Sequence, residues 1–318
     1  MRIVAIEPLG IPSERLCELG RQVLGEGHEF IFHQDRAEDF AELVKRAREA
    51  EALIAIEQPL SSKLLETCPN IRMVSLATGN FEQVDIEKAR QKVIPVFTSS
   101  GYATYSVGEL TIALMLGLYR NLCECDRQAR REDVSLSPGR GLFGKTVGII
   151  GTGDVGLHVA RVLKSLGCSV LAYSRTRKEE AEVWAGINYI ELDELLKQSD
   201  CVTMHAAVSD ETRMMIGERE LALMKRDALF INTASSELVD EKALAKSLRE
   251  GEIGGAGVSS FSPEEPLSKK HPLYRTPNTM LVPEEGAWTV DSLENRALAA
   301  FRNIADWLGG KPGNTPAH

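Results

Sequence analysis

The sequence lacks the cysteine pattern of a metal site or a disulfide scaffold, and it lacks a membrane-spanning run. Its six cysteines in 318 residues are too sparse for a disulfide framework, and Cys123 and Cys125 have no histidine or further cysteine nearby to complete a zinc site. The longest apolar run, at residues 110–119, is too short to cross a bilayer, and no basic and apolar leader precedes the first expected strand. We therefore expect a cytoplasmic protein with neither a metal centre nor a membrane partner.

A stripe of basic residues is also missing. The formal net charge is -9, so we do not expect nucleic acids or anionic membranes as partners. Hydrophobic residues make up 43% of the chain and charged residues 26%, which is typical of soluble globular proteins. A length of 318 residues exceeds what one compact core usually needs, so two domains are expected.

The order of sequence patterns predicts how these domains are built. Short β-rich runs alternate with amphipathic helical patterns over residues 2–99 and again over residues 146–283, which is typical of parallel sheets covered on both faces. Between them, residues 105–122 form a helical pattern that is apolar nearly all round its C-terminal half. We expect this helix to be buried between domains or between subunits.

The fold class that follows is α/β, with two doubly wound parallel-sheet domains. The last helical pattern follows the second sheet and is expected to return to the first domain. We therefore predict a discontinuous domain of residues 1–100 and 290–318, with a second domain of residues 101–289 inserted between its two parts.

The string GTGDVG at residues 151–156 directly follows the apolar run TVGII and opens a helical pattern. In this context Gly151 permits a tight turn, Gly153 lets the backbone approach a pyrophosphate, and Gly156 lets the helix pack closely on the strand. The first N–H groups of the helix would hold the anion. Asp154 places a negative charge near the pyrophosphate, and we expect its side chain to face solvent. A glycine-rich turn without a ligand is the alternative interpretation.

The end of the next strand predicts the choice of cofactor. It reads AYSRTRK, with Ser174 where an NAD enzyme carries a carboxylate for the ribose 2′-hydroxyl, and with Arg175, Arg177 and Lys178 just beyond. A 2′-phosphate would meet a hydroxyl and cations there instead of a repelling carboxylate. The pattern favours NADP(H) over NAD(H), which stays possible. A solvated basic loop is the alternative interpretation.

Several longer segments together resemble the D-isomer-specific 2-hydroxyacid dehydrogenases, which include glyoxylate/hydroxypyruvate reductases and phosphoglycerate dehydrogenases. The resemblance covers nearly the whole chain and rests on YSVGELTIALMLGLYRN, LFGKTVGIIGTGDVGLHVARVLKSLGCSVLAYSR, DETRMMIGERELALMKRDALFINTAS, LVDEKALAKSLREGEIGGAGV and FSPEEPL. It implies a flavodoxin-like substrate domain built from both chain ends, a central Rossmann cofactor domain and a homodimer formed around the long helix. It also implies an NAD(P)-dependent oxidoreductase that acts on the CH–OH/C=O pair of a small-molecule substrate.

The resemblance further implies binding residues. The segment LATGNFEQVD lies where the family binds the substrate carboxylate, which points to Thr78, Gly79 and Asn80, although a glycine is usual at Asn80. Trp288 is expected to form a wall of the substrate site or a core anchor. Further cofactor contacts are implied at Val155, Thr176, His205, Thr212, Thr233, Ala234 and Ser259.

Three catalytic side chains of the family are replaced in this sequence. Ser235 stands where the family has the arginine that clamps a 2-oxo acid, Ser262 where it has the glutamate that orients a histidine, and Glu284 where it has that histidine. The aspartate usual at Ser259 is also absent. A serine supplies no charge to a carboxylate, and a glutamate transfers protons near neutral pH only when burial raises its pKa. Its place after a parallel strand predicts that Glu284 lies in the ligand crevice, and a solvated turn formed by Glu284 and Glu285 is the alternative interpretation.

Three functions stay open. The chain is a nicotinamide-dependent oxidoreductase with Glu284 as proton donor and a polar pocket of Ser235, Ser259 and Ser262 for a non-standard substrate; or a catalytically silent NAD(P)-binding sensor or scaffold; or a nicotinamide-assisted lyase or isomerase. The first is favoured because loss of function by decay would not be expected to leave the nucleotide motif intact.

Overall fold

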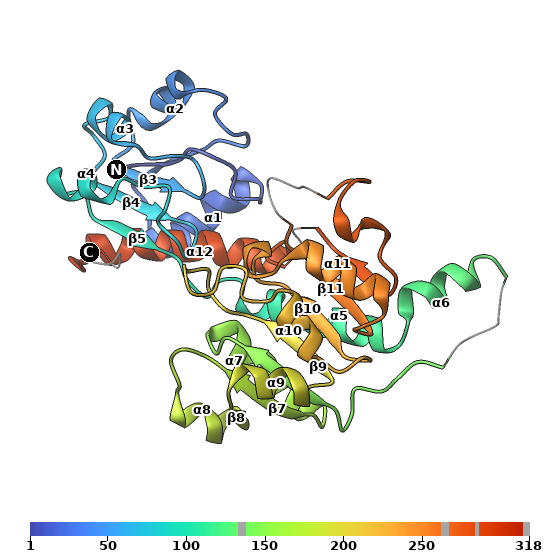
Figure 1. Cartoon of the computed structure of the whole chain (residues 1–318). Helices are drawn as coiled ribbons and strands as arrows, with labels where there is room; N and C mark the ends of the chain where they lie inside the picture. The colour runs from blue at the N-terminus through green and yellow to red at the C-terminus, as the bar shows by residue number, and fades with distance from the viewer. Residues whose placement is uncertain (133–137, 262–266, 284–285, 314–318) are drawn as a thin grey trace. The chain divides into compact units, whose positions relative to one another are not determined.

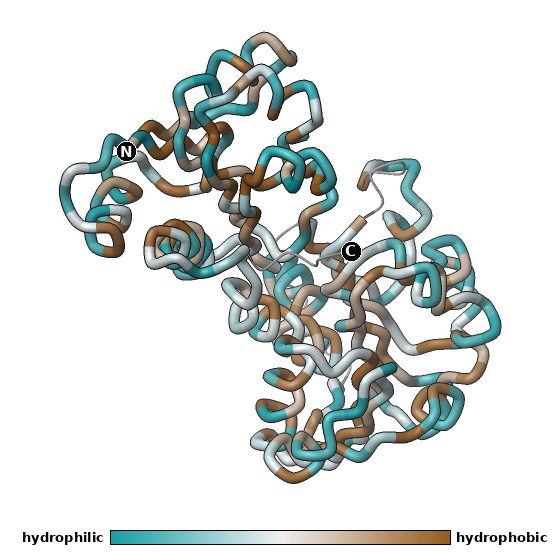
Figure 2. The backbone as a smooth tube through the Cα atoms, turned by 90° about the vertical axis from the view of Figure 1, so that its left-hand side faces the viewer, coloured by the Kyte–Doolittle hydropathy of each residue, from teal (hydrophilic) through white to brown (hydrophobic). Residues whose placement is uncertain are grey.

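The computed structural model describes residues 1–132, 138–261, 267–283 and 286–313 (Figure 1). The chain divides into two compact units: unit 1 consists of Met1–Ala103 with Thr289–His318, and unit 2 consists of Thr104–Trp288. Within the described ranges, the helices are all too short or too polar to span a membrane. Figure 2 shows that apolar and polar segments are interspersed along the backbone of each unit, and the strand residues are mostly buried, as expected when burial of apolar surface drives folding.

Unit 1 is built on a five-stranded parallel sheet with the strand order β2-β1-β3-β4-β5. Its register is set by pairs such as Val4 with Ile31 and Val4 with Leu53. Alternate residues along each strand enter opposite cores, which is the period of two that a sheet requires. The strands are β1 (Arg2–Ala5), β2 (Glu29–Phe32), β3 (Ala52–Ala55), β4 (Met73–Leu76) and β5 (Val96–Thr98).

Helices cover both faces of this sheet. On one face the core includes residues of α2 (Phe40–Ala47), α3 (Ser62–Thr67) and α4 (Ile86–Gln91). On the other face α1 (Ser13–Leu24) and the long C-terminal helix α12 (Val290–Leu308) pack together on the strands. Thr289 caps α12, because its hydroxyl accepts a hydrogen bond from the backbone N–H of Ser292 at 3.1 Å. The last helix thus returns to the first sheet, as its position in the sequence predicts.

Unit 2 contains a seven-stranded parallel sheet with the order β12-β11-β10-β9-β6-β7-β8. The chain starts at β6, proceeds to β7 and β8 on one side, and then crosses to β9 on the other side. The boundary between β6 and β9 is therefore the topological switch point, where open α/β sheets bind ligands. The strands are β6 (Thr146–Ile150), β7 (Ser169–Tyr173), β8 (Ile187–Tyr189), β9 (Cys201–Met204), β10 (Leu229–Asn232), β11 (Gly255–Val258) and β12 (Thr279–Leu281).

Two cores hold unit 2 together, one on each face of its sheet. The first includes α5 (Thr104–Tyr119), α7 (Asp154–Ser165) and α8 (Glu179–Trp184). The second includes α9 (Leu192–Gln198), α10 (Glu218–Leu223) and α11 (Glu241–Glu250). The remaining elements are α6 (Leu122–Ala129) and the 3-10 turns η1 (Ser236–Leu238) and η2 (Pro272–Arg275). The predicted α/β class with two parallel, doubly wound sheets is confirmed.

The long helix differs from its expectation in where it ends. It ends at Tyr119, because Asn121 adopts a left-handed conformation with φ 53° and starts the separate helix α6. Its burial is also explained within unit 2: Leu114, Met115 and Tyr119 pack into the core beside α7, and the Tyr119 hydroxyl donates to the carbonyl of Asp200 at 3.0 Å. The apolar surface of this helix contacts the sheet of unit 2. The sequence pattern alone cannot distinguish such a contact from an interface between domains or subunits.

Candidate functional site

The glycine turn between β6 and α7 has the geometry of an anion-binding loop. Gly151 has a φ of 97°, and a Cβ on it would lie 2.5 Å from the backbone N of Ala206. A Cβ on Gly156 would lie 2.1 Å from the carbonyl oxygen of Gly151, so helix and strand meet too closely for any side chain. Gly153, in contrast, faces open space. No side chain caps α7, so its first N–H groups are available to a phosphate.

A pocket of about 590 Å³ opens beside this turn, at the carboxyl ends of β6, β7 and β9. It brings together residues from three sequence-distant loops at the topological switch point. Of the predicted cofactor residues, the pocket is lined by Gly151, Gly153, Ser174, Arg175, Thr176, His205 and Thr212. Apolar side chains that sequence reasoning missed, Tyr173, Val208 and Met215, supply walls suited to an aromatic base.

The basic residues after β7 do not all face this pocket. Arg175 lines it, and its Nη1 lies 2.9 Å from Oε2 of Glu211, which also lines it. Arg177 donates to Glu191 at 2.9 Å instead, and its guanidinium lies over the ring of Tyr189. One of the two arginines is thus placed to meet a ligand in the pocket. Glu211 was not predicted, because nothing in the sequence connects the loop after β9 with a residue 36 positions earlier.

A second missed feature is a hydroxyl pair beside the glycine turn. The hydroxyl of Tyr189 donates to Oγ1 of Thr152 at 2.9 Å and accepts from the backbone N–H of Lys178 at 3.3 Å. Thr152 is the second residue of GTGDVG and also lines the pocket. This bond links the glycine turn to the loop that carries Arg175, so the two ligand-facing segments have a fixed spacing.

His205 is held as a neutral ring at the end of β9. Its Nε2 lies 3.0 Å from Oγ1 of Thr203, and desolvation lowers the pKa of the imidazole well below its usual range. A ring with this pKa does not form the imidazolium near pH 7, so His205 is not suited to act as a general acid. Thr212 has a local role, because its hydroxyl accepts from Ser209 N at 2.7 Å and donates to Ala207 O at 2.7 Å.

Other predicted cofactor residues do not line the pocket. Asp154 is exposed at the start of α7, with Val155 and Gly156 behind it. The hydroxyl of Thr233 lies 2.8 Å from that of Thr111, and because Thr111 donates to Val107 O, Thr233 is the donor of this bond. Thr233 therefore faces α5.

Asn232, at the end of β10, organises the loop in which Ser235 lies. Its side chain accepts from Ala234 N at 3.1 Å and donates to the carbonyl of Ser235 at 2.9 Å, while its own carbonyl accepts from Ser259 N at 3.0 Å. The Ser235 hydroxyl caps η1 by accepting from Glu237 N at 3.3 Å. Ser235 and Ser259 are thus held at the same sheet edge. Ser262 and Glu284 lie outside the described residues.

The predicted substrate loop follows β4 in unit 1. The carbonyl of Thr78 accepts from Ser99 N at 2.8 Å, which ties this loop to the end of β5, while Gly79 and Asn80 are exposed. Trp288 is 58% exposed. The expectation of a core anchor at Trp288 is therefore wrong, because the ring finds no apolar enclosure after β12.

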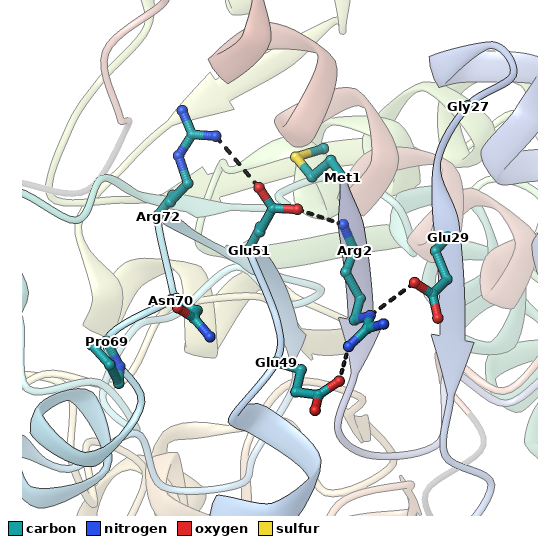
Figure 3. A pocket seen from close by; sticks show the side chains of 9 residues that line it. All are labelled: Met1, Arg2, Gly27, Glu29, Glu49, Glu51, Pro69, Asn70 and Arg72. Atoms are coloured by element: carbon teal, nitrogen blue, oxygen red, sulfur yellow. Dashed lines mark hydrogen bonds and ion pairs between the residues drawn. The ribbon is translucent and has the colours of Figure 1, made fainter.

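A polar hollow lies at the opposite edge of unit 1, at the amino ends of the strands (Figure 3). There the guanidinium of Arg2 contacts Glu29 and Glu49, and the carboxylate of Glu51 accepts from Arg2 N at 2.8 Å and contacts Arg72. These charges compensate one another, and Figure 3 shows the side chains directed at each other. The hollow therefore offers no unpaired charge to a ligand. In the described part of the chain, no group of three metal-ligating side chains occurs.

Comparisons with known proteins agree with this geometry. The model of the family "D-isomer specific 2-hydroxyacid dehydrogenase, NAD binding domain" matches residues 112–284. Glyoxylate reductase from Thermococcus litoralis is 33% identical over 317 residues, covering 96% of this chain and 95% of the relative. Glyoxylate reductase from Aeropyrum pernix is 37% identical over 279 residues, covering 85% and 83%. Among solved structures, the TT0316 protein from Thermus thermophilus superposes with a TM-score of 0.86 at 30% identity over 100% of both chains.

Proposed function

The chain belongs to the D-isomer-specific 2-hydroxyacid dehydrogenase family, and from this premise we propose that it is an NADPH-dependent reductase of a small carbonyl compound. The predicted class, a nicotinamide-dependent oxidoreductase that acts on a hydroxyl/carbonyl pair, is confirmed by its relatives. Glyoxylate is the first substrate to test, because curated relatives are glyoxylate reductases. The cofactor site lies in unit 2.

The observation that supports the cofactor is the pocket at the switch point. The glycine turn suits a pyrophosphate, and the end of β7 presents Ser174, Arg175 and Thr176 in place of a carboxylate. Hydroxyls and a guanidinium favour a ribose 2′-phosphate, whereas a carboxylate would favour a free 2′-hydroxyl. Bound there, the cofactor supplies a hydride to the substrate carbonyl. We therefore assign NADP(H) as the preferred cofactor, with Gly151, Gly153 and His205 as further contacts.

The catalytic assignment follows the positions of the replaced residues. Glu284 donates the proton to the carbonyl oxygen as the hydride arrives, and Ser235 and Ser262 contribute hydroxyls to the substrate pocket. This role requires a protonated Glu284 carboxyl. The neutral ring of His205 supports the assignment, because it leaves the proton to another group.

We further propose that the protein is a cytoplasmic homodimer. All six cysteines are free thiols, as is typical of proteins in a reducing compartment. Helix α6 has no buried residue and extends away from the body of unit 2 (Figure 1). An eight-residue helix without a buried residue is only marginally stable in water, so α6 needs a second surface, and a second copy of the chain supplies one.

The function is tested by NADPH oxidation, followed at 340 nm with glyoxylate and a panel of small carbonyl and imine compounds. We expect turnover by the wild type and its loss in Glu284→Gln, with NADPH affinity unchanged because the substitution leaves the nucleotide pocket intact. The competing function is a catalytically silent NADPH-binding sensor, which the presence of Ser235 in place of the family's arginine favours. NADPH binding without turnover of any compound in the panel would support that alternative.

A further inference from the structure

The loop after β7 carries Arg175 and Thr176 into the nucleotide pocket, but little packing holds this loop in place. Residues 175–178 are all exposed, so burial of apolar surface does not fix their conformation. At the end of the loop, the backbone N–H of Lys178 donates to the hydroxyl of Tyr189 at 3.3 Å. A loop without buried side chains depends on such polar contacts for its position.

Tyr189 is itself held firmly, both through its backbone and through its side chain. Within β8 it pairs with Ala172 of β7, and its ring packs against the core that includes α7. Its hydroxyl donates to Oγ1 of Thr152 at 2.9 Å, and Thr152 is only 3% exposed. The hydroxyl that receives the end of the loop therefore belongs to a side chain that is bound to the sheet and to the glycine turn at once.

The other contacts near the end of the loop are weaker anchors. Nη2 of Arg177 lies 2.9 Å from Oε1 of Glu191, but these side chains are 53% and 77% exposed, and an ion pair between exposed groups contributes little. The same guanidinium lies 6.0 Å from the centroid of the Tyr189 ring, at the far end of the cation–π range. Helix α8 follows directly, but it has six residues and buries only Ala181 among them. We therefore assign the anchoring of the loop to the Tyr189 hydroxyl.

The glycine turn does not depend on this anchor. Gly151 N donates to Tyr173 O at 2.8 Å, and the close approach of Gly156 to Gly151 fixes the turn on α7. Loss of the Tyr189 hydroxyl therefore releases the loop after β7 and leaves the turn in place. The pyrophosphate, which the turn is suited to hold, is common to both cofactors, whereas the 2′-phosphate near the loop belongs to NADP(H) alone. The binding of the two cofactors should thus respond differently to the loss of the anchor.

We propose that Tyr189 is a positioning residue for NADP(H), because its hydroxyl holds the loop after β7 at the distance from the glycine turn that brings Arg175 to the ribose 2′-phosphate. The inference rests on the proposed function, in which NADP(H) is the preferred cofactor. Tyr189 is not among the described residues that line the pocket, so it acts through the loop and not by contact with the cofactor. A loop that is ordered before binding costs less entropy on binding, which raises the affinity.

The test compares Tyr189→Phe with Tyr119→Phe by fluorescence titration with NADPH and with NADH. Each variant keeps its ring and loses a hydroxyl that donates a hydrogen bond, but the Tyr119 hydroxyl contacts Asp200 O at the amino ends of the strands. Tyr189→Phe should weaken NADPH binding about three- to tenfold and NADH binding by less than about twofold. The control should leave both affinities unchanged. Equal losses for the two cofactors in Tyr189→Phe, or wild-type NADPH affinity, would overturn the inference.

A double-variant cycle shows whether Tyr189 acts through Arg175. In the Arg175→Ala background, Tyr189→Phe should weaken NADPH binding by less than about twofold further, because the residue that it positions is already gone. A general loss of stability would lower the affinity by the same factor in both backgrounds, so additive losses contradict the inference. Amide hydrogen exchange tests the anchor without a ligand: the N–H of Lys178 should exchange faster in Tyr189→Phe than in the wild type, whereas that of Gly151 should keep its rate.

The outcomes separate this inference from the proposed function. A wild type that prefers NADPH and reduces a carbonyl compound, with no selective loss of NADPH binding in Tyr189→Phe, overturns the inference and leaves the proposed function standing. A selective loss in Tyr189→Phe, without NADPH oxidation by any compound in the panel, supports the inference and overturns the proposed reductase. Both results come from binding measurements that do not require turnover.

Discussion

Arg175 at the mouth of the nucleotide pocket has its guanidinium on the carboxylate of Glu211, with 2.9 Å between Nη1 and Oε2. Both side chains are exposed, at 81% and 73%, so their ion pair contributes only about 0–1 kcal/mol. A ribose 2′-phosphate carries more charge than one carboxylate and offers three acceptor oxygens. The phosphate can therefore displace Glu211, which acts as a competitor for the same guanidinium.

Arg175→Ala should therefore weaken NADPH binding about tenfold or more and change NADH binding by less than about twofold. Glu211→Gln removes the competitor and should tighten NADPH binding by up to about fivefold. Arg177→Ala is the control, because Arg177 contacts Glu191. Fluorescence titration with both cofactors measures these affinities. Equal losses for NADPH and NADH in Arg175→Ala would contradict the choice of NADP(H).

These residues also illustrate how much of a site a sequence reveals. Arg175 was predicted because its position after a strand next to a glycine motif has a chemical meaning. Glu211 was not, because its partner Arg175 is brought to it by the tertiary fold. A glutamate in a loop is ordinary, and only the bond that it makes to Arg175 distinguishes it.

At the scale of elements, the turn between β6 and α7 contains two glycines that are needed for different reasons. Gly156 allows close packing, since a Cβ would lie 2.1 Å from Gly151 O. Gly153 has a φ of -74°, which any residue adopts, and it faces open space. Its lack of a side chain is therefore needed by a ligand and not by the fold.

Gly156→Ala should lower the free energy of unfolding by about 1–3 kcal/mol, as overpacking of a core does. Gly153→Ala should change it by no more than about 0.5 kcal/mol and still weaken NADPH binding, because the added methyl group occupies the path of the pyrophosphate. Denaturant unfolding and NADPH titration of both variants measure the contrast. Unchanged NADPH affinity in a folded Gly153→Ala protein would show that the anion does not approach this turn.

The elements themselves were largely predictable. Short apolar runs that alternate with helical patterns of period 3.6 predict two parallel sheets. The structure contains two such sheets. The break between α5 and α6 was missed, although Asn121 is of a residue type that tolerates the left-handed conformation found there. The apolar pattern of α5 continues up to the break. It therefore predicted one continuous helix, and the conformational preference of Asn121 was overlooked.

At the scale of the whole molecule, helix α6 is the element least explained by one chain. Its eight residues include none that is buried, and Leu122 at its start is 55% exposed. An acidic chain with a net charge of -9 repels its own copies at long range, so a stable dimer needs apolar contact to offset the repulsion. The exposed apolar residues of α6 provide a candidate for that contact.

We therefore expect the wild type to have a mass of about 70 kDa in solution, twice the 34.9 kDa of the chain, by analytical ultracentrifugation. Leu122→Asp places a charge on α6 and should shift the protein toward the monomer. Val183→Asp is the matched control, since Val183 is 87% exposed on α8, and it should leave the dimer intact. A wild type that sediments as a monomer at micromolar concentration would contradict the proposal, and so would equal dissociation by both variants, because dimerisation would then depend on net charge and not on contact through α6.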